Sequence, residues 1–377
     1  MSALLDTVDP DGLLEFSVVF TDRSLNHMSA AFQEVMRDIS GMLREVYNAD
    51  AVALVPGGGT YAMEAVARQL ATGRTALVIR NGWFSYRWTQ IFEAGAIPAE
   101  EIVMPARRAG NAADAAFAPM PVDEVVAKIA AERPEVVFAP HVETSSGIIL
   151  PDAYLRAVAD AVHSVGGLFV LDCIASGCAW VDMKATGVDV LISAPQKGWS
   201  ASPSAGLVML SDAAVARVKE TQSTSFAVDL GKWLTIMEAY EGGGHAYHAT
   251  LPTDALRGFR DTMLEMRDHG FAKLAEAQWE QGRRVRAALA ARGIKSVAAE
   301  GFGAPGVVVC HTADPEVQSG RAFGTLGVQI AAGVPLMCGE GEAYKSFRIG
   351  LFGLDKLYDV EASVARLEAA LDRVLAA

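Results

Sequence analysis

The sequence predicts an α/β fold: a large domain with a mostly parallel, doubly wound sheet, plus a smaller C-terminal α+β domain. Up to about residue 252, short apolar runs alternate with stretches of helical periodicity. The runs are rich in Val, Ile and Leu at successive positions, which is typical of strands buried on both faces of a parallel sheet. Because 377 residues exceed one ordinary core, we expect two domains, 1–252 and 253–377.

The elements follow from these patterns in chain order. Apolar residues at three- and four-residue spacing predict a helix within 28–47, and the alanine- and proline-rich residues 105–121 indicate a surface connection. A helix is expected from about Tyr61. The strands expected in the first domain cover residues 51–55, 76–79, 135–139, 170–174, 190–193 and 207–210.

After residue 252 the pattern changes to that of one long helix, in which Gly270 is expected to cause a break or bend. Three short strands and a closing helix complete this second domain. The strands are expected at residues 307–309, 328–330 and 347–349, and the helix at 360–371.

The composition excludes several classes of function. The formal net charge of −13 argues against nucleic acids and anionic membranes as partners. No apolar stretch is long enough to cross a bilayer, and residues 1–6 lack the features of a signal peptide, so we expect a cytoplasmic protein. The four cysteines form no CxxC pair, which argues against a zinc site and a disulfide framework; they are Cys173, Cys178, Cys310 and Cys338.

Two polar residues at the ends of apolar runs are candidates for catalysis. Asp172 stands at the end of one expected strand, and Lys197 lies just past the end of another. Ligands bind at the carboxyl edge of open α/β sheets. An amine and a carboxylate there suit pyridoxal 5'-phosphate (PLP), because the lysine can form a Schiff base and the aspartate can keep the pyridine nitrogen protonated. Each residue alone is also typical of a turn or a solvated surface.

Three further segments could contact such a cofactor. Residues 57–60, Gly-Gly-Gly-Thr, stand between an expected strand and a helix and could cradle a phosphate, although glycine turns also occur without a ligand. Trp83 and Phe84 could stack on a flat ring or belong to the core. Thr144 and Ser145 could bind a ring hydroxyl or a phosphate, or cap the next turn.

Together these segments resemble class V aminotransferases of PLP fold type I, the group that includes alanine–glyoxylate and serine–pyruvate aminotransferases. The resemblance extends from about residue 45 to the C-terminus, and its specificity lies in the order of the segments rather than in any one of them. The segments are residues 57–60 with Glu64, 81–84, 143–147, 172–176, 193–197, 247–250 and 347–350.

The resemblance implies a role for each candidate residue. Lys197 would carry the Schiff base, and Asp172 would pair with the pyridinium nitrogen. Phe84 would stack on one face of the ring, Ile174 would pack near the other, and Ser145 would contact the polar edge of the cofactor. Four residues would hold the phosphate, namely Gly58, Gly59, Thr60 and Gln196.

The remaining implied roles concern the partner subunit and the substrate. Tyr247 and Thr250 would reach the phosphate of the neighbouring subunit's cofactor, which implies a homodimer with a shared active site. Arg348 would bind the substrate α-carboxylate through two parallel hydrogen bonds. The family implies ping-pong transfer from a small donor such as alanine or serine to glyoxylate or pyruvate. Residues 19–27 replace the Gly-Pro-rich segment that approaches the substrate in many members.

The same residues leave two alternative functions open. The nearest is another PLP reaction on the same fold, such as β-elimination by a lyase or cysteine desulfuration with Cys338 as the sulfur acceptor, but the flanks of Cys338 lack the basic residues that would activate a thiol. The other is a dinucleotide-dependent oxidoreductase or a non-catalytic binding protein. The oxidoreductase would need an acidic residue about twenty positions after the glycines, where Arg80 and Asn81 stand.

Overall fold

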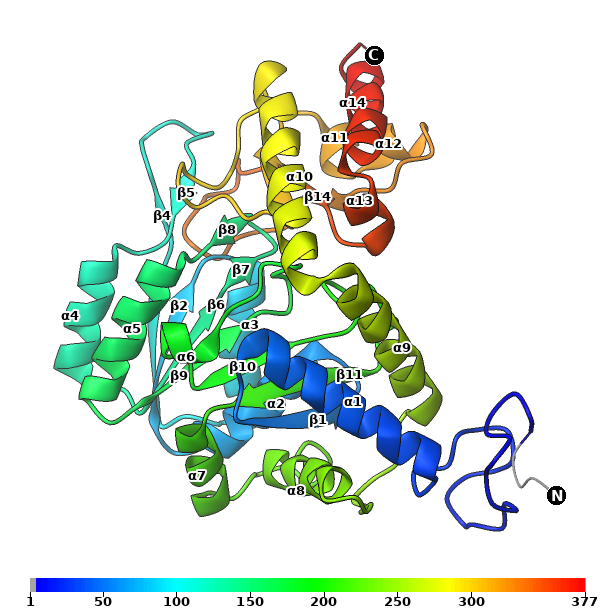
Figure 1. Ribbon diagram of the computed structural model, residues 1–377. Helices are drawn as coiled ribbons and strands as arrows, with labels where there is room; N and C mark the ends of the chain where they lie inside the picture. The colour runs from blue at the N-terminus through cyan, green and yellow to red at the C-terminus, as the bar shows by residue number, and fades with distance from the viewer. Residues whose placement is uncertain (1–4, 377) are drawn as a thin grey trace.

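The computed structural model describes residues 5–376, so residues 1–4 of the N-terminal segment considered above lie outside the described part. Its centre is a seven-stranded sheet with helices packed around it (Figure 1), in the strand order β1-β11-β10-β9-β6-β2-β3. The strands are β1 (Ala51–Pro56), β2 (Thr75–Arg80), β3 (Glu100–Pro105), β6 (Val136–Pro140), β9 (Leu168–Asp172), β10 (Val190–Ser193) and β11 (Ala205–Leu210).

This sheet is mostly parallel, as the sequence predicts. Only β11 runs antiparallel to its two neighbours, β1 and β10, while β10, β9, β6, β2 and β3 pair in parallel. Since β1 and β10 are both antiparallel to β11, β1 runs in the same direction as β10, β9, β6, β2 and β3. The carboxyl ends of β1, β2, β6, β9 and β10 therefore meet at one edge of the sheet, and the segments that follow them lie there together.

The helices around the sheet form where apolar residues recur at helical spacing. In α1 (Ala30–Tyr47), Phe32, Met36, Ile39 and Leu43 are buried, and the Ser29 hydroxyl caps the first turn by accepting a hydrogen bond from the Phe32 N–H. The other helices of this part are α2 (Gly59–Leu70), α3 (Trp83–Gly95), α4 (Val122–Glu132), α5 (Asp152–Ser164), α6 (Met183–Thr186), α7 (Asp212–Glu220) and α8 (Leu230–Glu241).

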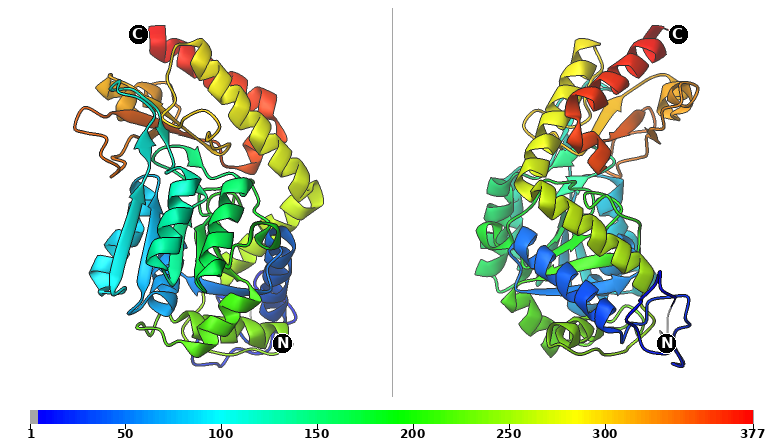
Figure 2. Two further views of the ribbon diagram at one scale, coloured as in Figure 1. Left: turned by 90° about the vertical axis from the view of Figure 1, so that its left-hand side faces the viewer. Right: turned by 45° about the vertical axis from the view of Figure 1, so that its right-hand side comes forward.

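A second, three-stranded sheet lies toward the C-terminus, in the order β12-β14-β13. Two long helices, α9 (Thr253–His269) and α10 (Phe271–Ala291), lead to it along one side of the molecule (Figure 2) and meet at Gly270, as expected. The strands are β12 (Val307–His311), β13 (Ala331–Ala332) and β14 (Ser346–Gly350), and the helices are α11 (Pro315–Gln318), α12 (Arg321–Gly324), α13 (Leu354–Tyr358) and α14 (Val360–Ala376).

The structure differs from the sequence-based expectations at several places. Residues 328–330 form no strand, because the Val328 N–H closes a turn onto the Phe323 carbonyl, and the third strand is the short β13. The helix expected from Tyr61 begins at Gly59. Strand β3 was not predicted, since it starts with two glutamates at the sheet's edge. Residues 105–121 include the short ladder β4 (Arg107–Arg108) and β5 (Phe117–Ala118).

No helix within residues 5–376 is both long and apolar enough to cross a membrane. In the same range, no group of three or more His, Cys, Asp or Glu side chains is placed to hold a metal ion.

A half-exposed histidine ties α5 to the loop before β10 and makes stability depend on pH. His163 Nε2 lies 2.9 Å from Asp189 Oδ2, and this hydrogen bond raises the pKa of His163 above its usual 6.5. The charged pair therefore stabilises the fold below pH 6.5, and this contribution is lost as the pH rises through the higher folded pKa. We expect His163→Gln to lower unfolding stability at pH 6 by up to about 1 kcal/mol, and by less at pH 9.

Urea unfolding at the two pH values checks this prediction. Lys128→Gln, which removes an exposed ion pair with Glu132 that contains no histidine, serves as the matched control. An equal loss for His163→Gln at both pH values would contradict the linkage.

Candidate active site

Asp172 and the segment that carries Lys197 leave the sheet side by side. Strands β9 and β10 pair in parallel, with Ile192 opposite Asp172, and the chain reaches Lys197 five residues after Ile192. The two charged groups are close enough that each shifts the pKa of the other. The neighbouring arrangement that the sequence predicts for these two side chains is therefore present at the carboxyl edge of the sheet.

The Asp172 carboxyl is buried and has one hydrogen-bond donor among the described residues. The Ile174 N–H donates to its Oδ1 at 2.9 Å. Burial raises the pKa of Asp172 to about 7, and the charge of Glu143 adds to the rise, whereas the Ile174 N–H, Arg87 and Lys197 oppose it. The carboxyl thus lacks a cationic hydrogen-bonding partner, which a protonated ring nitrogen would supply.

Lys197 is half-buried and lies near two arginines. Its Nζ lies 5.6 Å from the centroid of the Phe352 ring. Burial lowers the pKa of Lys197, and the guanidinium groups of Arg348 and Arg87 lower it further, while Asp172 acts in the opposite direction. A lysine with a lowered pKa is suited to act as a nucleophile or as a general base.

The glycine turn brings the start of α2 against the residues that follow Asp172. Gly58 is the N-cap of α2 and offers no side-chain cap, so the amide end of the helix is open to an anion. Any Cβ atom on Gly59 would overlap the Ile174 side chain. Gly57 has a φ of 121°, which L side chains rarely adopt. The structure thus brings Gly58, Gly59 and Ile174 together, with exposed Thr60 beside them.

Phe84 is held at the start of α3 by the side chain of Glu143. This buried carboxylate accepts from the Phe84 N–H at 3.1 Å and the Ser85 N–H at 2.9 Å. The Ser145 hydroxyl also donates to Glu143, at 2.7 Å, and accepts from the Trp83 N–H at 2.8 Å. Ser145 is therefore engaged inside the protein, and its expected contact with a cofactor stays a prediction.

Arg348 reaches this region from β14 of the C-terminal sheet. Its Nε donates to the Ala332 carbonyl at 2.8 Å, and its Cζ lies 5.6 Å from the centroid of the Phe84 ring. Among residues 5–376 it has no ion-pair partner, and burial lowers its pKa. A guanidinium without a carboxylate partner, beside Phe84 and Lys197, is suited to bind an anionic ligand.

Three predicted site residues are not brought into these contacts. Gln196 is exposed directly before Lys197. Tyr247 and Thr250 lie in the exposed loop after α8, where their hydroxyl groups are 3.3 Å apart, and the Tyr247 ring packs 5.5 Å from that of His27. None of their described contacts is with Asp172 or with Lys197.

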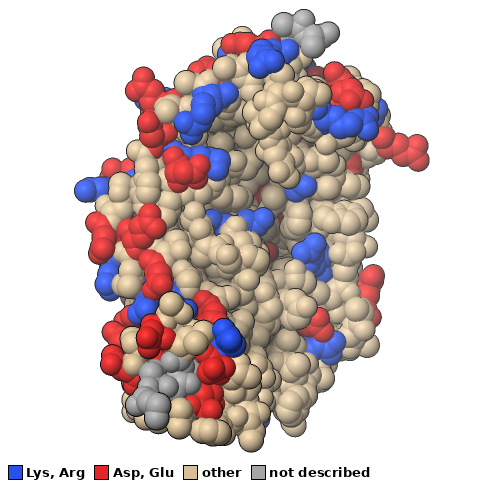
Figure 3. All heavy atoms as spheres, turned by 90° about the vertical axis from the view of Figure 1, so that its right-hand side faces the viewer, with Lys and Arg blue, Asp and Glu red and all other residues tan. Residues whose placement is uncertain are grey.

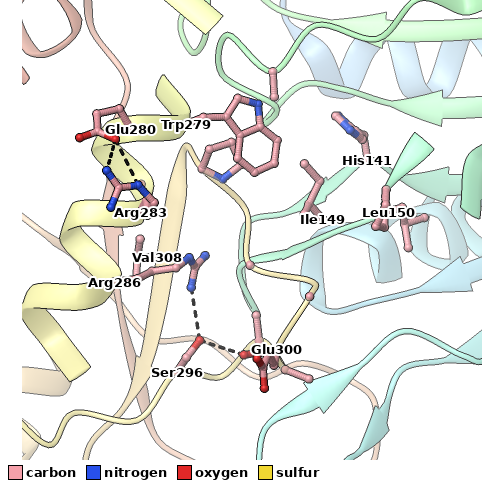
Figure 4. A pocket seen from close by; sticks show the side chains of 18 of the residues that line it. His141, Ile149, Leu150, Trp279, Glu280, Arg283, Arg286, Ser296, Glu300 and Val308 are labelled. Atoms are coloured by element: carbon pink, nitrogen blue, oxygen red, sulfur yellow. Dashed lines mark hydrogen bonds and ion pairs between the residues drawn. The ribbon is translucent and has the colours of Figure 1, made fainter. Parts of the chain in front are cut away.

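The surface and the cavities add two observations. Figure 3 shows one face on which acidic side chains gather at the lower left and several basic ones lie along a central hollow. A separate cavity of about 1240 Å³ lies between α10 and the hairpin of β7 (Val142–Glu143) and β8 (Ile148–Ile149). In Figure 4 its walls include His141 and Trp279, and none of the site residues described above lines it.

Comparisons with known proteins place these features in a family. Residues 15–300 match the family model described as aminotransferase class-V. The chain belongs to the class-V aminotransferase family.

Similar proteins of known sequence or structure have several names. The chain is 25% identical to the soluble hydrogenase small subunit of a Synechococcus species, over 92% of this chain and 87% of that one. It is 27% identical to the alanine–glyoxylate aminotransferase of Rattus norvegicus, over 71% and 62%. The crystal structure of the Nostoc alanine–glyoxylate aminotransferase superposes with a TM-score of 0.77 at 24% identity, over 93% and 88%.

Cys338 does not resemble an activated thiol of the class-V family. Its Sγ donates to the Arg80 carbonyl at 3.4 Å, and burial, with Glu143 and Glu340 nearby, raises its pKa to about 12. A sulfur acceptor needs an accessible thiolate. The desulfurase alternative is therefore not favoured.

Two residues near the site were given no role in the sequence analysis. Glu143 positions Phe84, and in the sequence it is visible only as the first residue of the resembling segment 143–147, directly before Thr144 and Ser145. Arg87 lies one helical turn after Phe84, and its Cζ is 5.3 Å from the Phe84 ring centroid. The spacing of three residues on a helix would have placed Arg87 on the same face as Phe84, had α3 been predicted.

Replacing Asp172 by Asn is expected to stabilise the cofactor-free protein at high pH. The carboxyl ionises near pH 4 when unfolded but at about 7 when folded, so its ionisation opposes folding increasingly between these values and fully above pH 7. Asparagine carries no such cost. The gain is on the order of 4 kcal/mol at most above pH 7 and shrinks toward pH 4.

Urea unfolding of the cofactor-free forms at pH 5 and pH 8.5 measures this difference. The exposed Asp22→Asn is the control, and it should change little at either pH. A gain for Asp172→Asn that is no larger at pH 8.5 than at pH 5 would show that the folded protein does not disfavour the charged carboxyl.

Proposed function

We propose that the chain is a PLP-dependent transaminase. In this proposal it moves an amino group from a small amino acid of the alanine or serine type to a 2-oxo acid such as glyoxylate or pyruvate, by a ping-pong mechanism. Membership of the family supports the reaction class. The names of similar proteins, the alanine–glyoxylate aminotransferases, support the substrate class.

The observation that carries the proposal is the pairing of β9 with β10. It sets a buried carboxyl with a raised pKa beside the segment of an amine with a lowered one. The two groups fit opposite ends of one pyridine aldehyde, because the acid needs a cationic donor and the amine is a nucleophile. When bound, PLP supplies an electron sink for the carbanion that forms at the substrate Cα.

The residues of the chain would act on the cofactor and substrate as follows. Asp172 would hold a proton on the pyridine nitrogen, and Lys197 would bind the cofactor covalently and, when free, would move the proton at the substrate Cα. Arg348 would hold the α-carboxylate and so fix the orientation of the Cα–H bond. Phe84 would lie on one face of the ring and Ile174 near the other.

The polar periphery of the cofactor is assigned to backbone and hydroxyl groups. Gly58, Gly59, Thr60 and Gln196 would hold the phosphate at the start of α2, where the N-cap offers no side chain. Ser145 would support the polar edge, and its bonds to Glu143 and Trp83 favour an indirect contribution through the position of Phe84.

We further propose a homodimer with a shared active site. Tyr247 and Thr250 would complete the partner's phosphate site, which their exposure supports. Apolar side chains that stand exposed near the N-terminus also favour burial against a second copy; they are Leu13, Leu14, Phe16 and Val18. The domain division at 252/253 is likewise proposed, as is a cytoplasmic location, which the four free cysteines support.

Lys197→Ala is expected to abolish transamination, by about a thousandfold or more, because both the covalent link and the base are lost. The yellow absorbance of the purified protein with PLP should disappear. Rescue by a small external amine would locate the loss in the missing amino group. An alanine variant that keeps full turnover would end the proposed mechanism, and Lys184→Ala, an exposed lysine on α6, is the control.

Shared active sites can be tested by mixing two inactive chains. One carries Lys197→Ala, and the other carries Tyr247→Ala with Thr250→Ala. If the hydroxyl pair serves the partner's site, each mixed dimer has one intact site. About a quarter of wild-type activity should then return, since half of randomly formed dimers are mixed. No recovery, in mixtures that size-exclusion chromatography and mass spectrometry show to contain mixed dimers, would place the pair in its own chain's site.

A further inference from the structure

Arg87 has no acidic partner although the chain is strongly acidic. It stands on α3, and within residues 5–376 no carboxylate lies within ion-pair distance of its guanidinium. In contrast, Arg44, Arg74 and Arg260 are each paired with a carboxylate at 2.8–2.9 Å. A guanidinium left unpaired among 45 acidic residues is available to a ligand.

The hydrogen bond of Arg87 points to the glycine turn. Its Nη1 donates to the Thr60 Oγ1 at 3.0 Å, so the guanidinium is anchored at the second residue of α2. The Arg87 Cζ also lies 5.3 Å from the Phe84 ring centroid, the ring that Arg348 approaches at 5.6 Å. The two arginines therefore flank one aromatic ring, but only Arg87 bonds to the cradle.

The charge of Arg87 reaches the centre of the site. It acts on both Asp172 and Lys197, lowering the pKa of each. A cation there compensates a dianionic group at the cradle, which the net charge of −13 would otherwise repel. Amide groups at a helix end supply only partial charges, so a full positive charge beside them strengthens anion binding.

We propose that Arg87 binds the 5'-phosphate of the cofactor together with the start of α2, and that the Thr60 hydroxyl orients its guanidinium. This inference rests on the proposed function and makes the Arg87 guanidinium the positively charged group that binds the phosphate. Arg348 remains the group for the substrate carboxylate. Arg87 thus contributes to cofactor affinity and position, and not to proton transfer.

Comparing PLP with pyridoxal, which lacks the phosphate, isolates this contact. Cofactor-free wild type, Arg87→Gln, Arg87→Lys and the control Arg156→Gln are titrated with each aldehyde, and binding is followed by visible absorbance. We expect Arg87→Gln to weaken PLP binding about tenfold or more, equivalent to about 1.4 kcal/mol, and pyridoxal binding less than about twofold. Arg87→Lys should lose less, because it keeps the charge without the fork.

Two further readouts strengthen the comparison. Inorganic phosphate should compete with PLP for the wild type and more weakly for Arg87→Gln. Arg156→Gln removes an equal charge from an exposed position on α5, outside the residues placed in the site, and should leave PLP affinity within about twofold of wild type. Circular dichroism and thermal unfolding establish that each variant is folded, and Arg87→Lys keeps the test valid if Arg87→Gln does not fold.

The possible failures are distinguishable. Equal weakening of PLP and pyridoxal in Arg87→Gln would make Arg87 a packing residue and overturn the inference. Unchanged PLP affinity with a raised KM for a dicarboxylic amino acid would assign Arg87 to a substrate side chain and overturn it as well. Should the wild type bind neither aldehyde at Lys197, the proposed function itself fails, whatever the variants do.

Discussion

The burial of one carboxyl group, that of Asp172, is the constraint on which the site depends. An ionised acid at the end of a buried strand is unfavourable unless a donor or a cation faces it, and within the described chain only the Ile174 N–H donates to it. The carboxyl stays buried in spite of this unfavourable free energy because β9 is held between β6 and β10 by parallel ladders. A rigid sheet can hold a poorly satisfied group in place where a loop would relax.

The same edge of the sheet gathers cations in an otherwise acidic protein. Lys197, Arg348 and Arg87 come from three separate segments, and burial, together with the charges of the two arginines, lowers the pKa of the lysine. Such a cluster suits ligands with several negative charges and one electrophilic carbon. Solved structures with different names share this architecture, so the fold by itself does not identify a substrate.

The sequence predicts the sheet well where strands are buried on both faces. The apolar runs before Asp172 and Lys197 correspond to β9 and β10, and Gly270 separates α9 from α10 as expected. It predicts less where the pattern is set by partners distant in sequence. The apolar residues of β11 do not indicate that it runs antiparallel to its neighbours. The role of Glu143 depends on its hydrogen bonds to α3, about sixty residues earlier in the chain.

Gly270 also determines how α9 and α10 are joined. With φ at 105°, it is the only residue between two helices that together span 253–291, and β14 with Arg348 lies beyond them. An L side chain rarely adopts this backbone conformation, so a β-carbon at position 270 would strain the junction. The angle between α9 and α10, and with it the path of the chain toward β14, therefore depends on a glycine at this one position.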